Sequence, residues 1–448
     1  MDKEKKIKPQ LAGGFRDYGP EEAAVRGRMF DSIKRIFELF GFIPIETPGV
    51  EREEVLTGGD ADFSKQIFRI AERNENDPLA LRYDLTVPLA RFVAQNQSKL
   101  PWPFKRYQIG GVWRAEQPQA GRYREFIQCD ADIVGSSRVS ADAEIIALAH
   151  ETFSALGISK FLIRVNTRKI LNGVAELAKF PPGKIPDVLR AIDKLDKRGW
   201  DAVERELEKL GGDVKLVKKV LDIRENNQKK ALVSVRALLE DSWAATQGID
   251  DLEKIADLLE SLGVPAKSWK VDFSVARGFG YYTGMVFEIV LEDVPLIGSV
   301  GGGGRYDGLV NRFSSINAPA VGFSVGIDRL YKACEELGII KSKQLSEALV
   351  LNFEPECETY CAEIVAGLRS AGVCAQLYLG NEESLKGQLS YAVKNNFNIV
   401  IIAGSDEKKR GAMQVRNLAE RSQFEVSKDE AVRRISKTSL LKMSKFMK

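Results

Sequence analysis

Two runs of β-type residues around a short polar loop, between positions 107 and 135, constrain the fold of this chain more than any other feature. The segment reads YQIGGVWRAEQPQAGRYREFIQCDADIVG. Its loop, residues 115–121, contains Pro118 and Gly121, which favour a turn. The segment therefore predicts two strands joined by a polar loop.

Charged side chains gather where the loop meets the two runs. Arg114 ends the first run, and Arg122 and Arg124 begin the second. Because alternate residues of a strand share a face, Arg122 and Arg124 are expected to point the same way, and Phe126 to join them. Guanidinium groups beside an aromatic ring suit a nucleotide, since they bind phosphate oxygens while the ring lies against the base. Further along this run, polar residues that could bind an ammonium group or an imidazole again share one face: Gln128, Asp130 and Asp132.

A glycine-rich stretch, RGFGYYTG at residues 277–284, combines a permanent cation with two phenols. Strand-like runs precede it at 272–275 and follow it at 285–290. Glycine lets the backbone approach a ligand closely, and Arg277 can grip a phosphate or carboxylate through two parallel hydrogen bonds. The stretch indicates an anion held beside a polar aromatic pocket, although a hairpin with a surface arginine and two tyrosines would produce the same pattern.

These stretches resemble motif 2 of the class II aminoacyl-tRNA synthetases and the histidine-specific signature of the histidyl-tRNA synthetase family. Three further matches are similar to other elements of that family, namely its amino-acid-binding strand and loop (81–88), its glycine-rich strand followed by motif 3 (301–309 and 321–330), and the dimer-forming motif 1 (21–48). The resemblance extends from residue 1 to about 435. It implies an α+β catalytic core built on an antiparallel sheet, a helical insertion and a C-terminal α/β domain.

The resemblance also implies an activity and a set of site residues. The chain would activate histidine with ATP to histidyl-adenylate and transfer it to the 3′ end of tRNA(His). Arg277 and Arg114 would be catalytic. The histidine-binding residues would be Asp84, Thr86, Gln128, Asp132, Arg277, Tyr281, Tyr282 and Tyr306. The ATP-binding residues would be Arg114, Glu116, Arg122, Phe126 and Arg329. ATP would be a substrate, with Mg²⁺ expected beside it.

Two positions depart from the family's common pattern. Gly280 stands where an acidic residue is common, and Ile127 stands where many members carry a histidine. Neither position matches a principal ligand. We therefore expect activity to be retained, with any difference confined to pocket geometry and tRNA recognition.

Changes in periodicity divide the chain into five parts. Two parts of the catalytic core, 1–166 and 263–340, flank a charged helical insertion at 167–262. Alternating strands and helices at 345–436 predict an α/β domain with a mostly parallel sheet, which resembles an anticodon-binding domain. A basic tail, 437–448, follows. The insertion is either a packing module or, by the resemblance, a clamp on the tRNA acceptor arm.

Composition narrows the class of protein without identifying it. The 448 residues are 44% hydrophobic and 29% charged, as in globular chains with two or three cores. The net charge of +3 is compatible with a tRNA partner but does not indicate one. The N-terminus lacks the apolar core of a signal peptide and no apolar run could span a bilayer, so a cytoplasmic location without a membrane partner is expected.

The cysteine and histidine content argues against disulfides, a zinc site and catalysis by a histidine base. Five cysteines without a CxxC pair indicate reduced thiols, and they form no zinc-ligand set with the single histidine, His150. His150 lies at helical spacing within residues 140–157, so we expect a partly buried helix residue rather than a general base.

Two other classes of protein stay open. One is a synthetase-like regulatory subunit of histidine biosynthesis, but such relatives usually lack catalytic arginines or the C-terminal domain, and this chain has both. The other is a generic nucleotide-binding α/β protein, which would make five ordered motifs a coincidence. The partners expected for the favoured interpretation are tRNA(His), L-histidine, ATP and a second copy of the chain.

Overall fold

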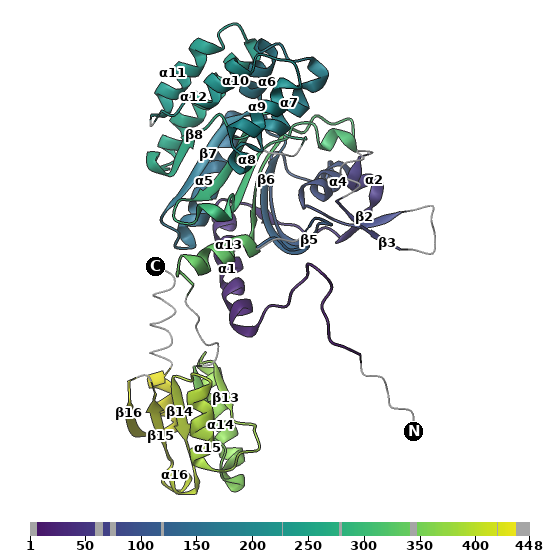
Figure 1. Ribbon diagram of the computed structural model, residues 1–448. Coiled ribbons are helices and arrows are strands. Elements are labelled where there is room, and N and C mark those ends of the chain that lie inside the picture. Colours follow the sequence, from purple (N-terminus) through teal and green to yellow (C-terminus); the bar gives the residue numbers. More distant parts are fainter. Residues whose placement is uncertain are drawn as a thin grey trace. The chain divides into compact units, whose positions relative to one another are not determined.

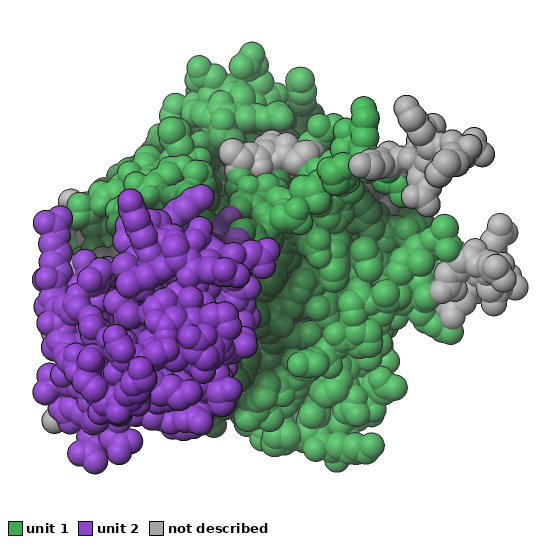
Figure 2. Space-filling view, turned by 90° about the horizontal axis from the view of Figure 1, so that it is seen from below, with its two compact units in different colours: residues 1–19, 25–341 green, residues 20–24, 342–448 purple. Residues whose placement is uncertain are grey.

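The structure is a computed structural model that describes residues 7–58, 66–71, 78–117, 121–225, 227–276, 280–340, 347–418 and 420–435. The chain forms two compact units (Figures 1 and 2). The first comprises residues 1–19 and 25–341, and the second comprises residues 20–24 and 342–448. Pro118 of the expected loop, Arg277 and the basic tail lie outside the described residues.

An eight-stranded sheet in the order β1-β5-β6-β11-β10-β9-β7-β8 forms the centre of the first unit. All neighbouring pairs from β5 to β7 in this order are antiparallel, while the outermost pairs, β1–β5 and β7–β8, are parallel. The expected α+β core with an antiparallel sheet is therefore confirmed, with parallel pairing only at its edges. The strands are β1 Ile43–Pro44, β5 Phe104–Trp113, β6 Glu125–Val134, β7 Phe161–Thr167, β8 Trp269–Val271, β9 Met285–Leu291, β10 Gly301–Arg305 and β11 Ala320–Gly326.

Alternation along β6 separates a core face from a polar face. The odd-numbered residues Cys129, Ala131 and Ile133 enter the main hydrophobic core. Among the helices that contribute to the same core are α1 Pro20–Leu39, α5 Val139–Ala155 and α13 Ile327–Glu336. The even-numbered residues of β6, including the two aspartates, consequently point to the opposite face, where the functional site lies.

His150 lies on α5 within this core, with its ring 5.4 Å from that of Phe161. It is buried, at 8% exposure. The expectation of a buried helix residue is confirmed.

A small three-stranded sheet, in the order β2-β4-β3, borders the polar face of the large sheet. Its strands and helices share a second hydrophobic cluster with Tyr306 and Phe104. This arrangement places the loop after β4 beside the site. The elements are β2 Val50–Arg52, α2 Glu53–Thr57, β3 Phe68–Ile70, β4 Leu79–Leu81 and α4 Thr86–Asn96.

The segment between β7 and β8 is helical, as expected (Figure 1). Its apolar residues belong to the same hydrophobic core as the sheet, so the helices pack as a continuation of the first unit. The approach of α6 and α12 is close enough that a Cβ on Gly248 would lie 2.8 Å from Lys169 Cβ. The helices are α6 Arg168–Leu177, α7 Ile185–Ile192, α8 Leu195–Arg198, α9 Trp200–Glu208, α10 Val214–Leu221, α11 Gln228–Leu238 and α12 Trp243–Ser261, with short 3₁₀ turns η1 Pro182–Lys184 and η2 Ala266–Ser268.

The prediction of a strand at residues 272–275 is wrong, because β8 ends at Val271. Asp272 Oδ1 accepts hydrogen bonds from the backbone nitrogen of Ser274 at 3.1 Å and from its hydroxyl at 2.6 Å. A side chain that bonds the backbone two residues on forms a turn that competes with strand pairing. The strand expected at 285–290 is confirmed as β9, and two 3₁₀ turns follow later, η3 Pro295–Ile297 and η4 Val310–Arg312.

The second unit contains a five-stranded sheet in the order β13-β12-β14-β15-β16. The expected α/β domain is confirmed, and its first three strands are parallel. The sheet as a whole is mixed, because an antiparallel pair over residues 412–427 extends it. The elements are β12 Ala348–Val350, η5 Pro355–Cys357, α14 Glu358–Ser370, β13 Ala375–Leu377, α15 Leu385–Lys394, β14 Ile399–Ile402, α16 Ser405–Arg410, β15 Ala412–Asn417 and β16 Ser422–Ser427.

Two further observations concern the thiols and the length of the helices. The five cysteines are free thiols, four of them buried. Across the described ranges, no helix has the length and apolar character needed to cross a bilayer.

Candidate active site

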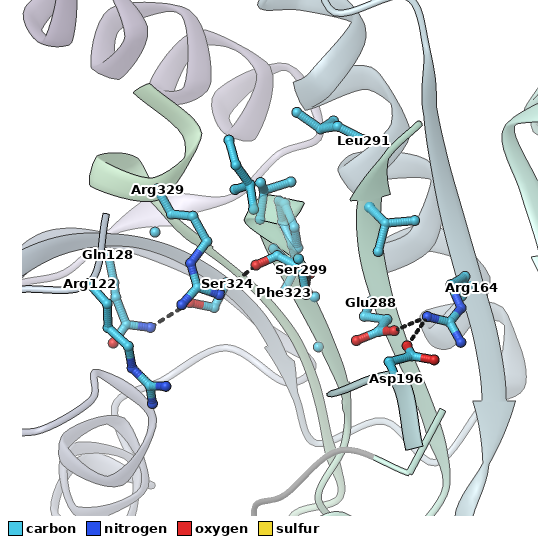
Figure 3. A pocket seen from close by; sticks show the side chains of 18 of the residues that line it. Arg122, Gln128, Arg164, Asp196, Glu288, Leu291, Ser299, Phe323, Ser324 and Arg329 are labelled. Atoms are coloured by element: carbon cyan, nitrogen blue, oxygen red, sulfur yellow. Dashed lines mark hydrogen bonds and ion pairs between the residues drawn. The ribbon is translucent and has the colours of Figure 1, made fainter. Parts of the chain in front are cut away.

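A cavity of about 1140 Å³ opens over the polar face of β6, β10 and β11 (Figure 3). It brings together every described residue that the sequence analysis assigned to histidine or ATP, and Arg277 is the assigned residue that falls outside the described ranges. The assigned residues that line it are Asp84, Thr86, Arg114, Glu116, Arg122, Phe126, Gln128, Asp132, Tyr281, Tyr282, Tyr306 and Arg329.

Asp132 lies deep in the cavity and is held by two partners. Arg106 Nη2 is 2.7 Å from its Oδ2, and the Tyr306 hydroxyl donates to its Oδ1. All three side chains are buried. Burial raises the pKa of Asp132, and the Arg106 guanidinium opposes this rise. The arrangement fixes a carboxylate and a phenol side by side, where they can pair with a donor and an acceptor on a ligand.

Gly322 leaves the space that this carboxylate occupies. It is the partner of Asp132 in the register of β11 against β6. A Cβ at Gly322 would lie 2.7 Å from Asp132 Cγ and nearer still to Oδ1. The orientation of Asp132 therefore requires glycine at position 322.

Arg106 belongs to the site but was not identified from the sequence, and Asp130 was placed on the polar strand face without being assigned to a substrate. Asp130 lines the cavity on the same face as Asp132 and is 1% exposed. Burial raises the pKa of Asp130 to about 7, with Arg106 opposing and Asp132 reinforcing the rise. Arg106 is fully buried opposite Asp132 in the β5–β6 register. The available signal was the strand face that Asp130 shares with Gln128 and Asp132.

Gln128 connects β6 to β11. Its Nε2 donates to Ser324 Oγ at 2.5 Å and lies 3.4 Å from Asp130 Oδ1 (Figure 3). These contacts orient the Gln128 amide next to the buried carboxylates of β6.

Asp84 adds a third buried carboxylate from the loop after β4. Its Oδ1 accepts a hydrogen bond from the backbone nitrogen of Val87 at 3.1 Å, at the start of α4. Its Oδ2 is buried and has no hydrogen-bond partner among the described residues. Burial raises the pKa of Asp84 to about 6, although the Val87 hydrogen bond and the Arg114 charge oppose the rise. A buried acceptor without a partner is suited to a cationic ligand group.

Three tyrosine rings enclose the space near these carboxylates. The ring of Tyr281 lies 4.9 Å from that of Tyr282 and 5.9 Å from that of Tyr306. Tyr282 in turn fits against Gly304, where a Cβ would lie 2.9 Å from its ring. The glycine-rich strand thus lets an aromatic wall approach the sheet closely.

The other part of the cavity is rich in arginine and meets the acidic part where Arg114 Nη2 donates to Gln128 Oε1 at 3.5 Å. Arg114 Nε donates to the Tyr83 carbonyl at 3.0 Å, and its guanidinium lies 5.0 Å from the centre of the Phe126 ring. Arg122 forms an ion pair with Glu116. Arg329 Nη1 donates to the Ser299 carbonyl at 2.7 Å (Figure 3). These contacts orient three cations that could bind a polyanion.

Arg124 does not accompany Arg122, contrary to the expectation that both share a face. Its Nε donates to the Glu116 carbonyl at 3.1 Å and its Nη1 to the Gly13 carbonyl at 3.3 Å. The reason is that β6 begins only at Glu125, so strand alternation does not extend to residues 122–124.

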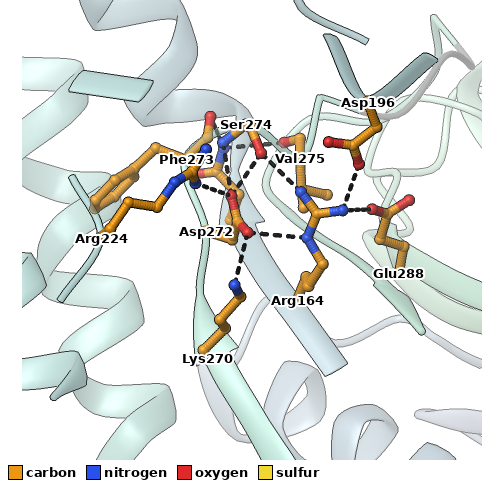
Figure 4. Close-up of polar contacts among 10 residues, drawn as sticks. Arg164, Asp196, Arg224, Lys270, Asp272, Phe273, Ser274, Val275 and Glu288 are labelled. Carbon is orange, nitrogen blue, oxygen red and sulfur yellow. Dashed lines mark hydrogen bonds and ion pairs between the residues drawn. The ribbon is translucent and has the colours of Figure 1, made fainter. Parts of the chain in front are cut away.

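The cavity continues towards the helices inserted after β7, where a charged cluster lines it (Figure 4). Arg164 Nε lies 2.9 Å from Asp272 Oδ2, and Arg164 Nη1 lies 2.8 Å from Glu288. Arg164 also pairs with Asp196 of α8. Burial of Asp272 is outweighed by the Arg164 charge and by hydrogen bonds, which lower the pKa of Asp272 to about 2. The cluster therefore joins the sheet to the inserted helices by ion pairs.

Comparison with known proteins agrees with this geometry. A family model described as histidyl-tRNA synthetase matches residues 14–330, and a model of an anticodon binding domain matches residues 347–438. A histidine–tRNA ligase of Cytophaga hutchinsonii is 40% identical over 96% of this chain and 99% of its own length.

Two solved structures are similar as well. The histidyl-tRNA synthetase from Nostoc sp. PCC 7120 has a TM-score of 0.85 and 32% identity, covering 96% of this chain and all of its own. A Bacillus halodurans protein titled as an ATP phosphoribosyltransferase regulatory subunit/histidyl-tRNA synthetase has a TM-score of 0.76 and 25% identity, covering 89% of this chain and 99% of its own.

The antiparallel sheet and its arginine-rich cavity are those of the class II aminoacyl-tRNA synthetases. Within this class, the chain belongs to the histidyl-tRNA synthetase family. Its activity is the ligation of histidine to tRNA at the expense of ATP. The regulatory-subunit alternative has less support, because the ligases match over nearly the whole chain.

Proposed function

We propose that the two ends of the cavity divide the substrates of histidine–tRNA ligation between them. The observation that carries this assignment is that one cavity holds two sets of charges, three buried carboxylates with a phenol and three arginines, which meet where Arg114 lies next to Gln128. Histidine carries an ammonium group and an imidazole, and ATP carries a triphosphate. The charges of the two ends match these groups.

At the acidic end, Asp84, Thr86 and Gln128 would take the ammonium group of histidine. The support is the buried Oδ2 of Asp84, which has no protein hydrogen-bond partner in the described ranges. Asp132 and Tyr282 would read the two imidazole nitrogens, with Tyr281 and Tyr306 completing the wall. A side chain lacking either nitrogen would leave a buried group unpaired, which disfavours it.

At the basic end, Arg114 and Arg329 would hold phosphates of ATP, Arg122 the γ-phosphate, and Phe126 the adenine ring. A carboxylate oxygen of histidine attacks the α-phosphorus, and the bond to pyrophosphate breaks as histidyl-adenylate forms. Arg277 would meet the negative charge that develops on the α-phosphate. In the second step, a ribose hydroxyl at the 3′ end of tRNA attacks the carbonyl carbon, and AMP leaves.

Mg²⁺ would enter with ATP as part of the substrate. In the described part of the chain, no group of three or more His, Cys, Asp or Glu side chains could hold a metal alone. Magnesium at ATP sites usually keeps several waters and binds phosphates with one or two carboxylates. Glu116, which lines the cavity beside Arg122, fits that more limited part.

We also propose a homodimer, working in the cytoplasm. Around the motif 1 segment, three apolar side chains are exposed, Leu39, Ile43 and Val50. These side chains would be available for contact with a second copy of the chain. The free state of the five cysteines suits a reducing compartment.

The domain limits stay predictions: a core at 1–166 and 263–340, an insertion at 167–262 and an anticodon-binding domain at 345–436. The second unit would bind the distant end of tRNA(His). The inserted helices would serve either as a packing module, which their place in the main core supports, or as a clamp on its acceptor arm.

Exchange of radioactive pyrophosphate into ATP tests the assignment. We expect exchange with histidine and with none of the other standard amino acids. Arg277→Ala should reduce adenylate formation about 10²–10³-fold, the usual effect of losing one donor to developing charge. Asp132→Asn should raise the KM for histidine and leave the KM for ATP nearly unchanged. Absence of histidine-dependent exchange in the parent enzyme would refute the function, and equal effects of Asp132→Asn on both substrates would refute the division of the cavity.

A further inference from the structure

The segment Gly13–Tyr18, which precedes α1, has no regular secondary structure, yet it contacts two parts of the ATP end of the cavity. Four of its residues are partly buried: Gly14, Phe15, Arg16 and Tyr18. Its N-terminal part contacts the residues just before β6, and its C-terminal part contacts the first turn of α13. We call this segment the N-terminal strap.

The first contact of the strap is with residues 122–124, which lie just before β6 and which we call the entrance of β6. The backbone nitrogen of Arg124 donates to the Gly14 carbonyl at 2.9 Å, while the Arg124 carbonyl accepts from the backbone nitrogen of Arg114 at 2.8 Å. The strap thus adds a third backbone to the end of the β5–β6 pair. Arg16 Nη1 donates to the Tyr123 hydroxyl at 3.0 Å.

Gly14 is needed for this close approach. Its φ is +86°, a conformation that residues with a Cβ rarely adopt. A Cβ there would also lie 2.8 Å from Arg124 Cδ. The backbone of the strap is therefore fitted to the entrance of β6.

The second contact is with Asp328, the neighbour of Arg329. The Tyr18 hydroxyl donates to Asp328 Oδ1, and Arg26 Nη1 lies 2.5 Å from the same oxygen. Asp328 Oδ2 accepts from the backbone nitrogen of Ile127 at 3.3 Å. The carboxylate is 5% exposed, so water competes little for its oxygens.

The Tyr18 ring is itself held in place. The guanidinium of Arg26 lies 3.8 Å from its centre, and that of Arg16 lies 4.5 Å away. Cations this close to a ring are attracted to its π face. The hydroxyl is therefore pre-oriented towards Asp328, and a change of Tyr18 to phenylalanine would retain the ring contacts.

We propose that Tyr18 and Asp328 are positioning residues for ATP, acting through Arg329. Asp328 fixes the first turn of α13 to β6, and Tyr18 fixes Asp328 to the strap. Through the same strap, the entrance of β6 that carries Arg122 is aligned with α13. The proposal rests on the assignment of the basic end of the cavity to ATP.

The hydrogen bonds that the strap makes to the rest of the described chain lie at the ATP end of the cavity, which makes the proposal selective. These hydrogen bonds join it to Tyr123, Arg124 and Asp328, next to the ATP residues, and the ring of Phe15 lies 5.9 Å from that of Phe68 in β3. Asp132 is held by Arg106 and Tyr306 instead. Loosening the strap should therefore weaken ATP use and leave histidine use unchanged, whereas general destabilisation of the fold would affect both.

The test is Tyr18→Phe in the full-length chain, assayed by histidine-dependent pyrophosphate exchange. Loss of a hydrogen bond to a charged group should raise the KM for ATP roughly tenfold. The KM for histidine should stay within about twofold. Arg16→Gln should raise the KM for ATP in the same direction, because it releases the other end of the strap from Tyr123.

Tyr107→Phe is the matched control. Tyr107 is a buried tyrosine whose hydroxyl also donates to a carboxylate, Glu38 Oε1, at 2.8 Å, but it joins β5 to α1 away from the strap. We expect the KM for ATP to be unchanged in this variant.

Three results would overturn the proposal while leaving the activity intact: an unchanged KM for ATP in Tyr18→Phe, an equal rise for both substrates, or the same rise in Tyr107→Phe. An inactive parent chain would instead refute the proposed function.

Discussion

Adding one methyl group at Gly322 should damage histidine recognition without touching ATP. In Gly322→Ala, the new Cβ would lie 2.7 Å from Asp132 Cγ, whereas ordinary contact begins near 3.4 Å. Since strands β6 and β11 pair in fixed register here, the carboxylate has to move by about 1 Å. A misplacement of that size costs roughly 10²-fold in rate, about 2.7 kcal/mol. We therefore expect kcat/KM for histidine to fall about 100-fold.

The assay is pyrophosphate exchange with each substrate varied in turn, together with thermal unfolding. The KM for ATP should change by less than about twofold, because the arginines of the basic end do not contact Gly322. Gly308→Ala serves as control, since Gly308 is exposed, follows Tyr306 by two residues and has no atom within 4 Å of an added Cβ. Unaltered histidine kinetics in Gly322→Ala would show that Asp132 does not read the ligand. Parallel losses for both substrates would show overpacking of the sheet instead.

Three further predictions test the charges and the division of the chain. The pKa of Asp130 is about 7 in the folded state, against 3.8 for an unperturbed carboxyl group. Between about pH 4 and pH 7, the folded state therefore holds a proton that the unfolded state has lost. The stability contributed by Asp130 consequently falls as pH rises. In Asp130→Asn, the free energy of unfolding, measured with urea, should therefore decline less between pH 5 and pH 8 than in the parent, and equal declines would contradict the assignment. Arg305→Met should lower the free energy of unfolding by about 3–5 kcal/mol, because it leaves the buried carboxylate of Asp142 without its partner at 2.9 Å. A decrease below about 1 kcal/mol would count against a structural ion pair. A chain ending at residue 340 should keep histidine-dependent exchange and lose most tRNA charging, and undiminished charging would exclude a tRNA-binding role for the second unit.

Much of the site was predictable because strand alternation is a local property. Gln128, Asp130 and Asp132 share a face in any β-strand, and the structure places all three in the cavity. The helical segment after β7 and the α/β pattern of the second unit were likewise visible from periodicity over many residues. In these places, the hydrophobic pattern and the tertiary structure agree.

The remainder depends on partners distant in the sequence. Arg106 faces Asp132 only because of the β5–β6 register, which no local pattern specifies. The Tyr18 hydroxyl donates to Asp328, which lies 310 positions further along the chain. The role of Asp328 therefore cannot be inferred from either segment alone. The strand expected at 272–275 failed for a local reason, since the bonds of Asp272 to Ser274 compete with pairing.

The parallel pairing of β7 with β8 limits how this chain can be shortened. The helices between them leave the end of β7 and return to the start of β8, so the connection must run back along the length of both strands. A parallel connection of this kind needs a dozen or more residues. Since β8 is the outermost strand of the sheet, an engineered deletion that joined the strands by a tight turn would lose β8. The backbone of β7 would then be an open edge, at which other chains could pair and aggregate.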